Sequence, residues 1–116
     1  MIINEFNDVV IGQMERCKSM LVVKGNEYAP EAKENADIDR LEHFKKAAVL
    51  MRTTPKVALM GMVVKHYISI MDMCTDEGDY PMEQWSEKIT DSINYLLILR
   101  AVVEEAQNEK DRSQNS

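Results

Sequence analysis

The sequence predicts an all-α, four-helix bundle-like protein that forms oligomers. Apolar residues recur every three or four positions in four segments, residues 4–24, 39–51, 55–74 and 81–106, and this spacing is typical of a helix with a buried face. No segment alternates apolar and polar residues as a strand would. The 116 residues suffice for one domain. We therefore expect a single helical domain over residues 1–106, followed by a disordered polar tail over residues 107–116.

The first two segments carry recognisable ends. Residues 4–24 finish at Lys24-Gly25, a cation in the last turn followed by the residue that best tolerates a left-handed stop. A polar connection over residues 26–37 leads to Asp39, a residue type that caps helix N-termini. Behind it, we expect one side of the second helix to be buried: Leu41, Phe44, Ala47, Ala48 and Met51.

The third segment is the most apolar of the chain. Thr54-Pro55 predicts its start, because proline suits the first helical position. Apolar residues then cover nearly the whole circumference up to Cys74, so the helix should be surrounded by protein. In a chain this short, part of that cover would come from another copy. We therefore expect a homodimer or homotetramer.

The fourth segment begins at Pro81 and has two faces. One face is an apolar stripe that we expect to be buried, formed by Trp85, Ile89, Ile93, Leu96, Leu97 and Val103. After Ala106 no apolar residue follows, which is why a tail is predicted.

Composition limits the classes of partner and compartment. The net charge of −6 makes non-specific nucleic-acid binding unlikely, because such binding requires a basic patch. The two cysteines, Cys17 and Cys74, stand in apolar helical settings, so we expect reduced core residues and a cytoplasmic protein. No signal peptide is visible, and the longest uninterrupted apolar run is short for a membrane span, so no membrane partner is expected.

Polar residues on the third and fourth helices form two lines. Glu87, Asp91 and Asn94 recur at i, i+4 and i+7. Lys65, Ser69 and Asp72 repeat that spacing on the helix before. One interpretation is a buried ion pair of Lys65 with Glu87 or Asp91 that fixes the register of the two helices.

The other interpretation is a polar cavity in which two carboxylates hold Mg²⁺, which needs only one or two carboxylates when substrate phosphates complete its shell. Lys24, Glu27 and Tyr28, in KGNEYA, would form the rim of such a pocket. His66 stands alone among apolar residues and is expected to be a hydrogen-bonded packing residue.

Four stretches together, KGNEYA, DRLEHFKKAA, KHYISIMD and WSEKITDSINYLLIL, resemble small phage and prophage proteins of a nucleotide-modification-associated group. These are related to the all-α nucleoside triphosphate pyrophosphatases, which include MazG and the dimeric dUTPases. The resemblance covers roughly residues 17–103. It implies that Glu87 and Asp91 are metal ligands and that Lys24 and Glu27 line the pocket.

The sequence departs from that family on the third helix. The pyrophosphatases carry Glu-x-x-Glu on the corresponding helix, giving four carboxylates for Mg²⁺, whereas this chain offers Lys65, His66 and Asp72. A lysine could replace a metal as the positive partner of a phosphate.

Two functions follow as expectations. The first is binding of a nucleotide or nucleoside triphosphate, with Mg²⁺-dependent release of pyrophosphate as the implied reaction. Lys24, Glu27, Tyr28, Lys65 and Asn94 would bind substrate, and Glu87 and Asp91 would bind the metal. The alternative is a non-catalytic helical module that binds a protein, which suits a chain with nine methionines because methionine adapts to varied surfaces.

Overall fold

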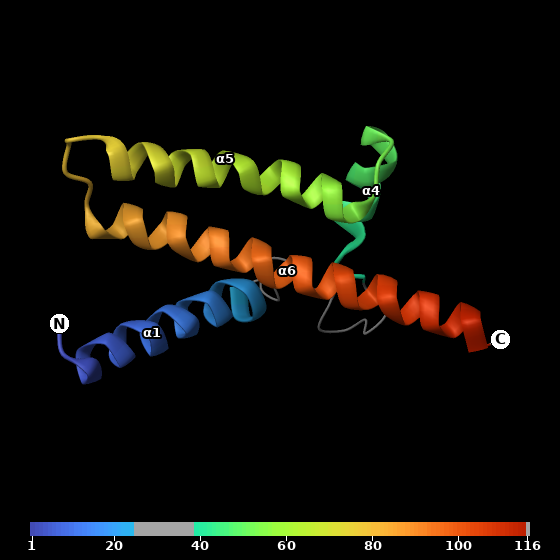
Figure 1. The fold of residues 1–116 in the computed structure, drawn as a ribbon, viewed down its shortest axis with the longest axis horizontal. Helices are drawn as coiled ribbons and strands as arrows, with labels where there is room; N and C mark the ends of the chain where they lie inside the picture. The colour runs from blue at the N-terminus through green and yellow to red at the C-terminus, as the bar shows by residue number, and fades with distance from the viewer. Residues whose placement is uncertain (25–38, 116) are drawn as a thin grey trace. The chain divides into compact units, whose positions relative to one another are not determined.

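The computed structural model describes residues 1–24 and 39–115, and these residues contain four α-helices and no strand (Figure 1). Of the described residues, 86% are helical, so the all-α prediction is confirmed. Where the sequence suggested one domain, the contacts divide the chain into two compact units, Met1–Ile38 and Asp39–Ser116. Each unit is described by itself.

The first unit contains α1 (Ile3–Lys18), which continues as the π-helical turn η1 (Ser19–Lys24). At the start of α1, the Glu5 side chain accepts a hydrogen bond from the Ile2 N–H at 3.1 Å, which satisfies one free donor of the helix N-terminus. The predicted first helix therefore extends to Lys24, and its last turn is π-helical. Cys17 is fully buried, whereas the apolar residues Phe6, Val10 and Met14 of the same helix are exposed.

The second unit begins with α4 (Glu42–Met51). Asp39 stabilises the turn just before the helix, where its Oδ1 accepts a hydrogen bond from the Leu41 N–H at 2.9 Å. The helix ends because Arg52 adopts a left-handed conformation, with φ of 55°, and Thr53 then donates its N–H to the Ala48 carbonyl at 2.9 Å.

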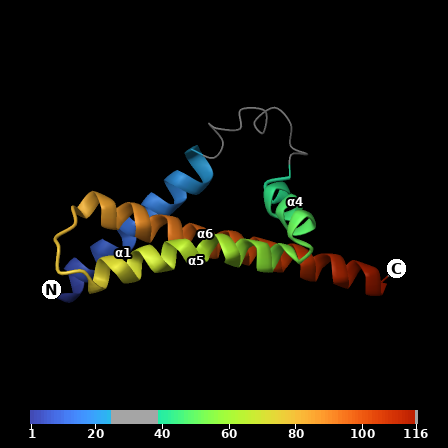
Figure 2. The same cartoon turned by 90° about the horizontal axis from the view of Figure 1, so that it is seen from above.

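A helical hairpin follows, made of α5 (Pro55–Thr75) and α6 (Met82–Asn115). Both predicted starts are confirmed: the Thr54 hydroxyl accepts the Val57 N–H at 3.4 Å ahead of Pro55, and Pro81 immediately precedes α6. The two helices run antiparallel and side by side in both views, and α4 crosses the N-terminal end of α5 (Figures 1 and 2).

The core of this unit lies where the three helices meet. Phe44 of α4, Leu59 and Val63 of α5 and Val102 of α6 are buried together. Five half-buried apolar side chains pack around them: Leu41, Met62, Tyr95, Ile98 and Leu99. Burial of this apolar surface is what holds α4 and α6 against α5.

The buried side of α6 differs from the predicted one. Leu96 and Leu97 are 45% and 39% exposed, and Val103 is also exposed. The contacts to the core come instead from Tyr95, Ile98, Leu99 and Val102. The prediction was wrong for the three exposed residues, whereas Trp85, Ile89 and Ile93 of the same stripe are half-buried. It failed because α6 carries apolar residues on two sides, and helical spacing does not show which side meets the neighbouring helix.

Two smaller expectations also differ. Helix α6 continues to Asn115, where the sequence predicts a disordered tail from residue 107, and the Gln107 amide donates to the Asp111 carboxylate one turn later at 3.1 Å. All side chains over residues 107–115 are exposed, so this extension buries nothing of its own.

Cys74 is exposed, unlike the predicted core cysteine, because it lies near the exposed end of α5.

Candidate functional site

The polar line of α6 runs from solvent into the protein. Glu87 is exposed, Asp91 is half-buried, and Asn94 is buried. The Asn94 Oδ1 finds no hydrogen-bond partner among the described residues. A buried acceptor without a partner costs roughly 1–3 kcal/mol, so this amide is the least satisfied group of the line.

Lys65 lies on an exposed flank of α5. Its side chain is exposed, although the fully buried Ala58 lies two helical turns before it on the same side of α5. Within the described part of the chain, no ion pair joins Lys65 to Glu87 or Asp91. The structure thus does not form the ion pair that the first interpretation expected.

Three further candidates cannot be placed. Glu27 and Tyr28 lie outside the described residues, as does the side chain of Lys24, whose backbone is the last of η1. Of the seven candidate residues, four therefore have a described environment: Lys65, Glu87, Asp91 and Asn94.

The metal ligands expected on α6 are two carboxylates one turn apart. Glu87 lines a shallow depression of about 340 Å³ together with Pro81, Glu83, Gln84 and Lys88. Over residues 1–24 and 39–115, no group of three or more His, Cys, Asp or Glu side chains is placed to hold a metal ion. Two carboxylates fit Mg²⁺ only if a ligand's phosphates and water supply the remaining oxygens.

His66 packs as predicted but without the expected hydrogen bond. Its ring lies against that of Tyr95, with centroids 5.1 Å apart, and so joins α5 to α6. The buried Nδ1 has no partner among the described residues.

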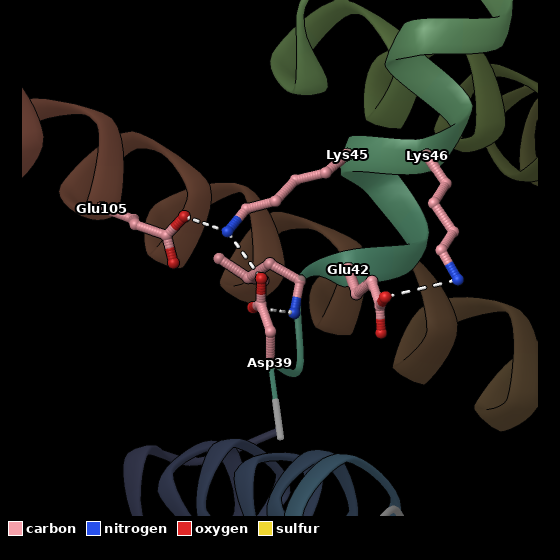
Figure 3. Close-up of polar contacts among 6 residues, drawn as sticks. Asp39, Glu42, Lys45, Lys46 and Glu105 are labelled. Atoms are coloured by element: carbon pink, nitrogen blue, oxygen red, sulfur yellow. Dashed lines mark hydrogen bonds and ion pairs between the residues drawn. The ribbon is translucent and has the colours of Figure 1, made fainter. Parts of the chain in front are cut away.

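The best-connected charges of the second unit lie elsewhere, at the junction of α4 and α6 (Figure 3). The Lys45 ammonium contacts the Asp39 carboxylate at 2.6 Å and the Glu105 carboxylate at 2.5 Å. These hydrogen bonds raise the pKa of Lys45, and the bond to Lys45 lowers the pKa of Asp39. The cluster joins the start of α4 to α6. Because all three side chains are partly exposed, it is a surface ion-pair network.

The most unusual surface is one that sequence reasoning expected to be covered. Six large side chains on the side of α5 opposite its core residues are each between 36% and 63% exposed: Val57, Met60, Val64, Tyr67, Ile68 and Met71. We call this set the α5 face. The sequence already indicated an unusual surface here, because apolar residues cover nearly the whole circumference of this helix.

Helix α5 is also long and apolar enough to cross a membrane, by length and composition alone. Its other side, with Ala58, Leu59 and Val63, is buried in the second unit.

Comparison of the chain with models of protein families, with curated proteins and with solved structures found no match. The resemblance to the all-α pyrophosphatases therefore stays a prediction.

Proposed function

We propose that this protein is a helical interaction module that binds a protein partner through the α5 face. The observation that carries the proposal is the exposure of six large apolar side chains along one side of a single, regular helix. Folded proteins rarely leave a contiguous apolar patch of more than a few hundred Å² in water unless it is a contact surface.

The composition of the α5 face suits a protein partner. Methionine and tyrosine are enriched in the cores of interfaces, and methionine adapts its shape to the opposing surface. Two charged residues flank the patch on α5, Lys65 and Asp72, and both are exposed. An apolar centre with a charged margin is the usual anatomy of an interface.

The proposal can be tested by photo-crosslinking from within the face. A photoreactive amino acid at Val64 should give a discrete protein adduct on irradiation in the cells that naturally make this protein. The same group at Lys110, on the exposed end of α6, is the matched control and should give none. If irradiation of Val64 and Ile68 variants yields no adduct while both proteins fold, the α5 face is not an interaction surface.

A second candidate function, nucleotide binding, is supported by the unsatisfied Asn94 Oδ1. Helical spacing places Asn94 on the same side of α6 as Glu87 and Asp91. An amino group of a base would give this oxygen its missing donor. The two carboxylates would then hold Mg²⁺ together with the phosphates, and a bound Mg²⁺ would polarise those phosphates.

Thermal shift with a panel of nucleotides, with and without Mg²⁺, tests this second candidate. A true ligand at a hundred times its dissociation constant should stabilise the protein by about 2.7 kcal/mol. Asn94→Leu, which has a similar shape but no acceptor, should lose the base-dependent part, and Asp91→Asn should lose the Mg²⁺-dependent part. Absence of any shift at millimolar nucleotide would exclude this function.

A further inference from the structure

The positions of the α5 face, though not its residue types, are symmetric about Val64. Val57 and Met71 lie seven residues on either side of Val64, which is two helical turns. Met60 and Ile68 lie four residues on either side, and Gly61 and Tyr67 lie three residues on either side. These spacings are those of any helical side, and they allow each residue to meet its counterpart when a second copy is turned end for end.

We propose that the partner of the α5 face is a second copy of this chain, packed with its α5 antiparallel and with a two-fold axis passing near Val64. The proposal rests on the function proposed above and names the occupant of that surface. An interface across a two-fold axis uses the same patch on both copies, which the symmetric spacing of these positions allows. Val57 would then lie against the partner's Met71, and Met60 against the partner's Ile68.

The sizes of the opposing side chains support this register. Gly61 would lie opposite the partner's Tyr67, the largest side chain of the face. A Cβ atom built at Gly61 would be in ordinary contact with the end of the Met51 side chain, at 3.9 Å, so a tyrosine ring there requires this flexible side chain to turn aside. A tyrosine ring opposite a glycine fits where two large residues would collide.

The exposed area is sufficient for a dimer. The exposed fractions of the six side chains correspond to an area on the order of 500 Å² per copy, or on the order of 1,000 Å² for two copies, which is about the minimum for a specific interface.

Charge favours the antiparallel direction over the parallel one. Lys56 stands near the start of α5 and Asp72 near its end. Parallel packing would place like charges at the same level along the two helices. Antiparallel packing brings Lys56 to the level of the partner's Asp72 and also opposes the two helix dipoles.

Cysteine crosslinking tests the arrangement directly. The parent is Cys74→Ser, because Cys74 is exposed whereas Cys17 is fully buried. In this parent, Val64→Cys should crosslink to itself on oxidation, because residue 64 faces its own copy. Val57→Cys alone should not, because its two copies would lie about 21 Å apart along the axis. A mixture of Val57→Cys and Met71→Cys should crosslink.

Light scattering of the unmodified protein should show twice the 13.3 kDa of one chain at micromolar concentration, and Val64→Glu should return it to one chain. Val64 is half exposed, so circular dichroism of this variant should stay helical.

Each other outcome overturns the proposal in a distinct way. Self-crosslinking of Val57→Cys would mean parallel packing. A single-chain mass without a Val64→Cys crosslink would mean that no second copy occupies the face. If the photo-adduct from Val64 then contains a different protein, the interaction module stands and only self-association fails. Co-flotation of the single chain with phosphatidylcholine–phosphatidylglycerol vesicles would make a lipid surface the occupant instead.

Discussion

At the residue scale, Asp76 organises the connection between α5 and α6. One carboxylate oxygen accepts the Gly78 N–H at 3.0 Å, and the other accepts the Tyr80 hydroxyl at 2.5 Å. The hydrogen bond to the Asp76 carboxylate raises the pKa of Tyr80, and the same bond lowers the pKa of Asp76. The Tyr80 ring in turn meets Trp85 edge to face at the start of α6.

These two pKa shifts define the pH range over which the hydrogen bond between Tyr80 and Asp76 stabilises the loop. The contribution of Tyr80 to stability is present below the pKa of an unfolded tyrosine and is lost as the pH rises through the raised value. The contribution of Asp76 is present above the usual pKa of aspartate and is lost as the pH falls through the lowered value. Between these limits, at neutral pH, the hydrogen bond is intact.

We predict that Asp76→Asn lowers the pKa of Tyr80 towards the ordinary tyrosine value, because the amide carries no negative charge. Ultraviolet titration of tyrosinate absorbance measures this, and a Tyr80→Phe variant identifies which of the four tyrosines is responsible. An unchanged titration curve in Asp76→Asn would show that Tyr80 is not bonded to this carboxylate in solution.

At the element scale, α5 and α6 each have one apolar side in the core and another that is exposed. Leu59 of α5 is fully buried, whereas Leu97 of α6 is 39% exposed. The free energy of unfolding should therefore depend on these two leucines very differently, although both stand in apolar stretches of sequence.

Leu59→Ala should lower the free energy of unfolding by roughly 2–5 kcal/mol, the usual range for a leucine removed from a core. Leu97→Ala should cost about 1 kcal/mol, because less apolar area is lost. Chemical denaturation of both variants at one protein concentration provides the comparison. If the two variants lost the same free energy of unfolding, Leu97 would have to be buried in a contact of its own in solution.

The end of α6 should contribute little to stability. Over residues 107–115 every side chain is exposed, and a polar helical extension without tertiary contacts is marginal in water. Deletion of residues 107–116 should leave the melting temperature within about 2 °C of the full chain. A larger decrease would show that this segment makes a contact in solution.

At the scale of the whole molecule, the dimer proposed through the α5 face would couple stability to protein concentration. Two copies dissociate when they unfold, so higher concentration favours the folded dimer by mass action. The melting temperature of the full-length protein should rise as concentration increases over two orders of magnitude. The Val64→Glu variant should show no such dependence. A wild-type melting temperature independent of concentration would contradict the dimer.

Sequence alone determined the helices and most of their ends. Thr54-Pro55 and Pro81 mark starts that the structure confirms, because hydrogen bonding and backbone restriction at a helix terminus depend on a few neighbouring residues. The polar line of α6 was also visible, since helical spacing fixes which residues share a side. The unusual apolarity of α5 likewise followed from composition.

Only the tertiary structure decided which side of each helix is buried. Helical periodicity gives the angles between residues on one helix, but it contains no reference to the neighbouring helix. When two sides are apolar, as on α5 and α6, either can face the core. Contacts with Phe44, Leu59 and Val63 select Tyr95, Ile98, Leu99 and Val102 on α6. The same contacts leave Lys65 in solvent and the α5 face uncovered, because a helix packed on one side cannot bury the other without a further partner.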